Sequence, residues 1–220
     1  MRRLALALVL LCAACATPER PAAFVDASRV VPGLVVYMRY ATSDNFVGAP
    51  VDGYRRNVCL LTRPAAEALA QVQKDLKAQG LGLKVYDCYR PRRAVAHFMR
   101  WAADLKDQRT KVRFYPDVDK SRLFAEGYIA QRSGHSRGST LDLTLVDASG
   151  RELDMGGEHD LLSPRSWPAD ASVPAEARAN RQTLAAAMQR RGFAPYDKEW
   201  WHFTLKGEPF PATYFDFPVR

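Results

Sequence analysis

In three stretches of the chain, apolar residues recur every three or four positions, a spacing that puts them on one face of a helix. Helices are therefore predicted over residues 64–79, 91–106 and 174–191. Proline stands in the first turn of the first helix, and Gly80 and Gly192 follow the first and third as stop signals. The expected buried stripe of the first helix is Ala65, Leu69, Val72 and Leu76, and that of the second is Val95, Phe98, Met99, Ala102 and Leu105.

Four other stretches have the composition or the alternation of β-strands, namely residues 34–40, 83–89, 140–146 and 200–205. The alternation is strict over 140–146, where three leucines share one face with polar residues opposite, so this strand is expected to be half-buried. The hairpin-like strands and segregated helices favour an α+β fold over a doubly wound parallel sheet.

The first sixteen residues have the pattern of a bacterial export signal: two arginines, then an apolar stretch too short to span a bilayer. Within this stretch, the run Leu-Cys-Ala-Ala-Cys ending at Cys15 resembles a lipobox, with its leucine one place early. Cys15 would then carry a lipid anchor. Cleavage after Ala16 and a retained N-terminal helix are the alternatives.

Three segments follow from this pattern. Residues 1–16 are predicted to be a lipoprotein-like signal peptide cleaved near Cys15, residues 17–30 a loose Pro/Ala-rich linker, and residues 31–220 a single folded domain. The expected location is the periplasm or the cell envelope, with membrane anchoring through Cys15 as one outcome.

Composition narrows the class of protein further. With 47% hydrophobic and 25% charged residues, the chain can bury a core, which excludes gross disorder, collagen and coiled coil. The net charge of +8 is spread without a Lys/Arg-rich run, so no nucleic-acid partner is expected. A modest basic balance also suits an anionic envelope or an acidic substrate.

Two cysteines, Cys59 and Cys88, remain after the signal segment. In an oxidising compartment they could form a disulfide, and two separate buried thiols are the alternative. Neither residue has the neighbours of a catalytic nucleophile.

The four histidines differ in their surroundings. His97 points away from the apolar stripe of its helix and His159 lies in a polar loop, so both are expected to be structural or solvated. His135 stands before a turn and the strand that carries Asp142 on its polar face, whereas His202 lies on another strand.

Two imidazoles and one carboxylate, here His135, Asp142 and His202, are the ligand set of many catalytic zinc sites, with a fourth position left for water. Glu199, three residues before His202, could accept a proton from that water. This role requires Glu199 at the strand entry or beside a bulge, because residues three apart face opposite sides of a regular strand. From spacing alone, a structural Asp and capped histidines are the favoured alternative.

The run from Ser133 to Asp142 (SGHSRGSTLD) resembles the SxHxxGxAxD motif of the zinc D,D-peptidases of family M15, with Thr140 where that family often has alanine. Glu199-Trp-Trp-His202 resembles the ExxH motif of the family, and Tyr89-Arg90-Pro91 its YRP element. Residues 40–46, 142–145 and 154–156 resemble elements of the D-alanyl-D-alanine dipeptidase branch, the VanX-like enzymes. The similarity spans roughly residues 30–215.

The resemblance implies a compact α+β fold of the Hedgehog and D,D-peptidase type, an antiparallel sheet with flanking helices and a metal cleft. It implies one Zn2+ per chain, held by His135, Asp142 and His202. Glu199 would then be the catalytic base, and Arg90 would stabilise the oxyanion.

Ser133 and Tyr40 are further candidates for holding the ends of the substrate, while Trp200 and Trp201 are expected to pack. The polar loop with Asp44 and Asn45 is a candidate for the closed end of a dipeptide pocket, with a solvated turn as the alternative.

The activity implied is hydrolysis of D-alanyl-D-alanine, a small D,D-dipeptide, in cell-wall metabolism. A zinc D,D-carboxypeptidase acting on peptidoglycan stem peptides is the alternative within the same class. A noncatalytic zinc-stabilised binding module is the third hypothesis, but such a module needs neither Glu199 nor Arg90.

Overall fold

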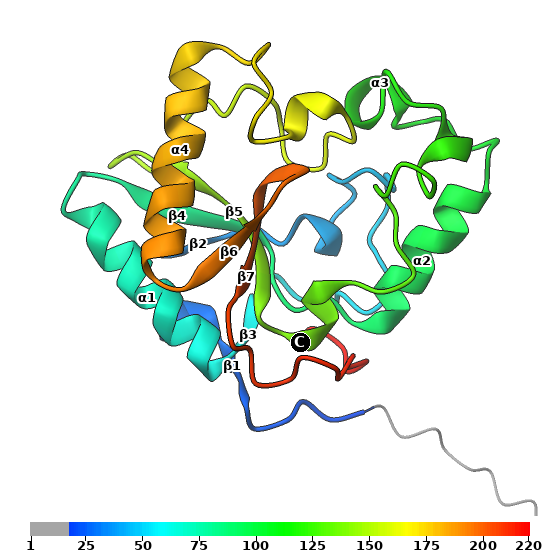
Figure 1. The fold of residues 1–220 in the computed structure, drawn as a ribbon. Coiled ribbons are helices and arrows are strands. Elements are labelled where there is room, and N and C mark those ends of the chain that lie inside the picture. Colours follow the sequence, from blue (N-terminus) through cyan, green and yellow to red (C-terminus); the bar gives the residue numbers. More distant parts are fainter. Residues whose placement is uncertain (1–17) are drawn as a thin grey trace, which may run out of the picture.

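The computed structural model describes residues 18–220, and the predicted signal segment over residues 1–16 lies outside this part (Figure 1). Its main sheet has five strands in the order β2-β4-β5-β7-β6. These are β2 (Val35–Val36), β4 (Gly82–Asp87), β5 (Thr140–Val146), β6 (Phe193–Tyr196) and β7 (Glu199–Leu205). All pairings are antiparallel except that of β2 with β4. The α+β class is thereby confirmed.

The predicted strands over 83–89, 140–146 and 200–205 are present as β4, β5 and β7. Of the strand expected over 34–40, only β2 forms, and a 3-10 turn at Arg39–Ala41 follows it. The alternation pattern did not predict β6, which is short and contains a proline.

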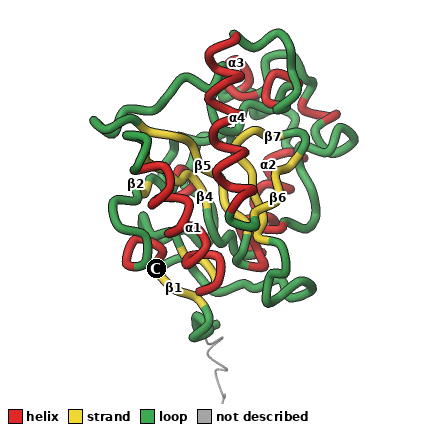
Figure 2. Tube along the Cα trace, turned by 60° about the vertical axis from the view of Figure 1, so that its left-hand side comes forward, coloured by secondary structure: helices red, strands yellow, loops and turns green. Residues whose placement is uncertain are grey.

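Residues 18–220 contain four α-helices. They are α1 (Arg63–Lys77), α2 (Arg92–Ala103), the short α3 (Lys111–Phe114) and α4 (Ala175–Arg190). Of these, α1 and α4 lie against the sheet, while α2 and α3 lie on the other side of the molecule (Figures 1 and 2). Both α1 and α4 pack on one face, where the β5 leucines and the predicted α1 stripe form one core cluster. On the other side, α2 belongs to a second, aromatic cluster. Because α2 ends at Ala103, the predicted stripe residue Leu105 is exposed.

All seven residues of β5 are buried, which corrects the half-buried strand expected from its alternation. The strand is central, so it is paired on both edges and covered on both faces. On its polar face, Asp142 is contacted by Arg90 and His159 from other parts of the chain. Polar side chains in such a position need hydrogen-bond partners, opposite charges or a ligand.

A two-stranded ribbon joins the N-terminal end of the described chain to the domain. Strand β1 (Phe24–Asp26) pairs antiparallel with β3 (Leu60–Thr62). The ring of Phe24 lies so close to Gly138 (φ +85°) that a Cβ there would collide with it. A loose linker was expected over residues 17–30, and the pairing of β1 corrects this expectation for the second half of that segment.

A disulfide joins Cys59, just before β3, to Cys88, just after β4. The sequence left open a disulfide or two separate buried thiols, and the structure contains the disulfide. The carbonyl oxygen of Cys88 accepts a hydrogen bond from Nδ1 of His135 at 2.8 Å. The bridge thus fixes a backbone segment that contacts a candidate site residue.

None of the helices within residues 18–220 combines the length and the apolar character needed to cross a membrane.

We predict that replacing both cysteines, Cys59→Ser with Cys88→Ser, lowers the free energy of unfolding by about 2 to 4 kcal/mol. The bridge closes a loop with a sequence separation of 29 residues, and its loss returns entropy to the unfolded chain. Denaturant unfolding of both proteins, with and without reductant, measures the difference. Reductant should destabilise only the wild type. Two free thiols in the oxidised wild type, counted by alkylation under denaturing conditions, would contradict the bridge.

Candidate functional site

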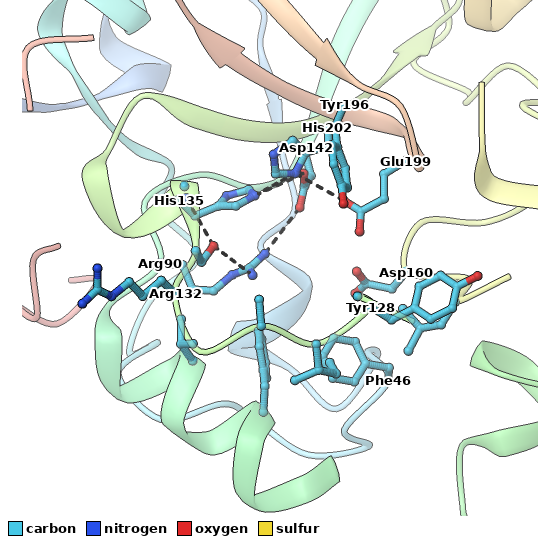
Figure 3. Close-up of a pocket in the computed structure, with 18 of the residues that line it drawn as sticks. Phe46, Arg90, Tyr128, Arg132, His135, Asp142, Asp160, Tyr196, Glu199 and His202 are labelled. Atoms are coloured by element: carbon cyan, nitrogen blue, oxygen red, sulfur yellow. Dashed lines mark hydrogen bonds and ion pairs between the residues drawn. The ribbon is translucent and has the colours of Figure 1, made fainter. Parts of the chain in front are cut away.

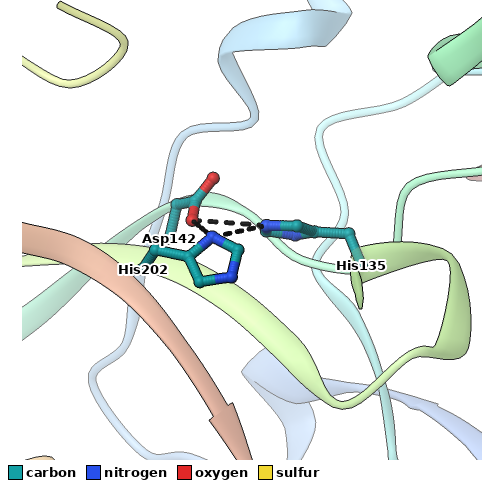
Figure 4. A group of neighbouring side chains, drawn as sticks. All are labelled: His135, Asp142 and His202. Carbon is teal, nitrogen blue, oxygen red and sulfur yellow. Dashed lines mark hydrogen bonds and ion pairs between the residues drawn. The ribbon is translucent and has the colours of Figure 1, made fainter. Parts of the chain in front are cut away.

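Three predicted ligands converge on the polar face of the sheet (Figure 4). Asp142 on β5 is directly opposite His202 on β7. His135 lies in a 3-10 turn, Gly134–Arg137, whose first turn is capped by the Ser133 hydroxyl. One ligand atom from each residue lies within 4.8 Å of the other two.

The contacts within this triad suit a divalent metal. The Asp142 Oδ1 atom lies 3.3 Å from His135 Nε2 and 3.1 Å from His202 Nδ1, yet it accepts no hydrogen bond from any group in the described chain. Since His135 donates from Nδ1 to the Cys88 carbonyl, its Nε2 carries the lone pair, and this atom lies 3.3 Å from His202 Nδ1. Two imidazole nitrogens, which must be unprotonated to bind a metal, and one carboxylate oxygen are a donor set that zinc accepts readily.

The charges around the triad also favour a cation. Burial alone would raise the pKa of Asp142, but the imidazoles beside it hold that pKa well below its usual range. Burial would likewise lower the pKa of His202, but Asp142 and Glu199 outweigh it and raise the value to about 9. Asp142 is thus held ionised, with the Glu199 carboxyl group nearby.

Glu199 reaches the same cavity because of a local irregularity in β7. It is the first residue of the strand, directly after the two-residue turn Asp197–Lys198, and the register of β6 with β7 shifts between Pro195 and Tyr196. The Glu199 Oε2 atom lies 3.3 Å from His202 Nδ1. The strand-entry position required by the sequence argument is therefore present.

Arg90 lies beside the triad and lines the cavity (Figure 3). Its Nε donates to Asp87 Oδ2 at 2.8 Å, and its Nη2 lies 3.6 Å from Asp142 Oδ2. Burial would lower the pKa of Arg90, but the carboxylates of Asp87 and Asp142 raise it. A second guanidinium nitrogen, Nη1, donates to Ser133 Oγ at 3.4 Å. The side chain is therefore a fixed, permanently charged donor.

The cavity is small, about 200 Å³, below the roughly 300–1,000 Å³ of sites for drug-sized ligands. Tyr40 and Ser133, the two further candidates, both line it. Burial raises the pKa of Tyr40, so its phenol stays protonated, and it donates to Asp160 Oδ1 at 3.0 Å.

Asp160 lines the cavity as well, and the sequence analysis did not identify it. Its Oδ2 atom is buried and accepts no hydrogen bond from the described residues. Burial raises the pKa of this carboxyl group. Its backbone is left-handed (φ 67°), which is uncommon for a residue other than glycine. The only sequence signal was an acidic residue beside His159 in a polar loop.

Asp44 and Asn45 do not reach the cavity, which corrects their candidate role. The Asn45 side chain is buried and donates to backbone carbonyls of its own loop, at Arg39, Thr42 and Ala49. Asp44 forms ion pairs with Arg39 and Arg113 instead.

The other tryptophan and histidine residues named in the sequence analysis lie in three different settings. Trp200 and Trp201 are buried in the core cluster, as expected. His97 accepts a hydrogen bond from the Asp52 backbone, away from the triad. His159, expected in a polar loop, is instead buried against Asp142.

Comparison with known proteins gives matches over nearly the whole chain. A family model of the M15 peptidases, described as D-Ala-D-Ala dipeptidase, matches residues 20–220. A D-alanyl-D-alanine dipeptidase of Streptomyces coelicolor is 48% identical over 90% of this chain and 97% of its own length. Proteins of the same name from Enterococcus faecium and Escherichia coli are 42% and 37% identical, over 90% and 86% of this chain and 98% and 86% of their own lengths.

We predict that His135→Ala, Asp142→Ala and His202→Ala each sharply lower the metal content of the purified protein, because each removes one of three converging donors. Elemental analysis after dialysis against zinc measures the effect. His97→Ala serves as the matched control and should retain the metal content of the wild type. Near-stoichiometric zinc in all three triad variants would refute this site.

Proposed function

Because the chain belongs to the D-Ala-D-Ala dipeptidase family of M15 peptidases, we propose that it hydrolyses free D-alanyl-D-alanine to two D-alanines, using one bound zinc ion. As a member of this family, the protein is a metallopeptidase of cell-wall metabolism. The roles of individual residues in this reaction are our proposal.

His135, Asp142 and His202 would hold the zinc ion, and the orphaned Oδ1 atom of Asp142 supports this assignment. When bound, zinc supplies Lewis acidity toward the attacking water and the peptide carbonyl. Glu199 takes the proton of that water and then delivers it to the departing amine. Its position beside His202 and its place in the cavity wall support this role.

Arg90 stabilises the negative charge that develops on the carbonyl oxygen. Its guanidinium is held by Asp87 and Ser133, so it does not have to reorganise when the charge appears. Arg90 remains charged throughout the reaction, since an arginine side chain does not lose its proton in proteins.

The observation that favours a dipeptide over a longer substrate is the Asp160 carboxyl group in the wall of the same small cavity. Its Oδ2 atom accepts no hydrogen bond from the described residues, and its nearest imidazole nitrogen, His159 Nδ1, lies 3.4 Å away. A buried carboxylate needs a cationic partner. The free ammonium of a dipeptide supplies one, whereas the acylated amine of a stem peptide does not. Tyr40 orients Asp160 through its hydrogen bond to the other oxygen.

We also propose that the protein is exported to the periplasm or the cell envelope, with Cys15 as a lipid anchor. The composition of residues 1–16 supports export, as does the Cys59–Cys88 bridge, because disulfides persist in oxidising compartments. Cleavage after Ala16 would lead to the same compartment without the anchor.

We predict that Glu199→Ala and Arg90→Ala keep the bound zinc but lose turnover. Loss of a general base typically lowers kcat by about 10²–10⁴-fold, and loss of an oxyanion donor by about 10²–10³-fold. Initial rates on D-alanyl-D-alanine, together with metal analysis of each variant, test both roles. A variant that retains zinc and turns over at the wild-type kcat would remove its residue from the mechanism.

We predict that N-acetyl-D-alanyl-D-alanine is a poorer substrate than the free dipeptide by on the order of 10³-fold or more in kcat/KM. Acetylation removes the ammonium and leaves Asp160 without a partner. Asp160→Asn should lower kcat/KM for the free dipeptide and so reduce the ratio between the two substrates.

Comparable kcat/KM for both substrates in the wild type would favour a D,D-carboxypeptidase. Cleavage of neither substrate by the zinc-loaded protein would favour a noncatalytic binding module.

A further inference from the structure

The buried histidine His159 lies between two carboxylates. Its Nε2 atom is 3.4 Å from Asp142 Oδ2, and its Nδ1 atom is 3.4 Å from Asp160 Oδ2. The residue is 1% exposed. Of these two contacts, only the one at Nε2 is a hydrogen bond, and Nδ1 forms none with the described residues. Apolar packing does not explain a buried ring whose Nε2 faces a carboxylate, because burying that nitrogen costs free energy unless it has a partner.

The apolar faces of the ring are fully used. The imidazole stacks on Tyr86 with ring centroids 4.7 Å apart, and it meets Trp201 edge to face at 5.2 Å. A phenylalanine could make the same contacts between these two rings. Aromatic packing therefore explains the ring at this position but not its nitrogen atoms.

The backbone around His159 holds the ring in this orientation. Arg39 donates from Nη1 to the His159 carbonyl oxygen at 3.2 Å, and the same guanidinium pairs with Asp44 and Glu158. The next residue, Asp160, has the left-handed backbone noted above. An uncommon conformation persists where surrounding contacts impose it, and such positions gather at functional sites.

The two oxygens of Asp142 face different partners. Oδ1 lies 3.3 Å and 3.1 Å from the ligand nitrogens of His135 and His202. Oδ2 faces away from them, toward His159 Nε2 at 3.4 Å and Arg90 Nη2 at 3.6 Å. An N–H group at Nε2 of His159 would hold Oδ2 of Asp142 in place. It would therefore oppose rotation of this carboxylate and oppose binding of a metal ion through both of its oxygens.

We propose that His159 is a positioning residue that donates from Nε2 to Asp142 Oδ2, and thereby keeps Oδ1 directed between His135 and His202. This proposal rests on the proposed function insofar as it takes the triad as the metal site. Partners that hydrogen-bond a metal ligand typically contribute about 10–100-fold to metal affinity or activity.

The test compares His159→Phe, which keeps an aromatic ring but removes both nitrogens, with His159→Gln, whose amide can still donate near the Nε2 position. His97→Phe is the matched control, since His97 lies away from the triad. Zinc dissociation constants come from competition with a chromophoric chelator. We expect about 10–100-fold weaker zinc binding in His159→Phe, part of that loss restored in His159→Gln, and no change in His97→Phe.

Two spectroscopic measurements and one kinetic measurement distinguish a positioning role of His159 from general damage to the fold. The visible absorption of the Co2+-substituted protein should shift in His159→Phe and move back toward the wild type in His159→Gln, because it reports ligand geometry. At saturating zinc, kcat should fall in His159→Phe with little change in KM. In the zinc-loaded wild type, long-range 1H–15N NMR should find the His159 proton on Nε2.

The inference is overturned if His159→Phe binds zinc as tightly as the wild type with an unchanged Co2+ spectrum. A proton on Nδ1 alone in the wild type would also overturn it, and this measurement decides the matter even if His159→Phe does not fold. Failure of the wild type to bind zinc would instead refute the proposed function. If the wild type binds zinc and is active, and zinc affinity and the Co2+ spectrum are unchanged in His159→Phe, this inference is refuted while the proposed function stands.

Discussion

The buried carboxylate of Asp142, in the middle of the central strand, is the constraint on which the rest of the site depends. Taking an ionised carboxylate out of water costs of the order of several kcal/mol, and only well-placed partners offset that cost. Here the partners are nitrogens from four residues: His135, His159, His202 and Arg90. They come from separate segments of the chain, so burial of one side chain determines where four segments meet. A metal ion bound at Oδ1 would add positive charge beside the Asp142 carboxylate, whose negative charge these nitrogens offset only in part.

Each of the two strands beside β5 has one irregular pairing near the site: β4 with β5 beside Asp142, and β7 with β6 beside Glu199. These irregularities supply the site with residues that a regular sheet would direct elsewhere. In β4, Val85 pairs with Leu143 on the apolar face, so regular pairing would put Asp87 opposite Leu141 on that same face. The register shift pairs Asp87 with Asp142 instead, on the polar face. The shift between β6 and β7 does the same for Glu199. Irregularities of this kind commonly redirect side chains at active sites.

The sequence could predict features that depend on local patterns, but not those that depend on contacts between residues distant in the chain. Alternation and helical periodicity predicted three of the main strands and the three long helices. Residue types and spacing pointed to the triad and Glu199, and the family motifs then favoured this site over a structural one and added Arg90. Asp160 and His159 were missed as site residues because their loop meets Tyr40 and Asp142 only through contacts distant in sequence, with a left-handed residue at its end. Local patterns carry no signal for such a loop. The burial of both faces of β5 was missed for a similar reason, since alternation reports a polar face but not what covers it.

The four residues from Asp87, the last residue of β4, to Arg90 contribute both to stability and to the chemistry of the site. The Asp87 carboxylate contacts His135 and holds Arg90, and the Cys88 carbonyl sets which nitrogen of His135 is free. Tyr89 packs into the aromatic cluster, and Arg90 enters the cavity. The disulfide at Cys88 therefore restrains the segment from which one metal ligand and one charged donor take their orientation. The three ligands come from separate segments, so contacts that fix the backbone of each segment help to hold their side chains together. In this protein the covalent bridge and the hydrogen bond to His135 act on the same peptide unit, so loss of the bridge would disturb ligand orientation as well as chain entropy.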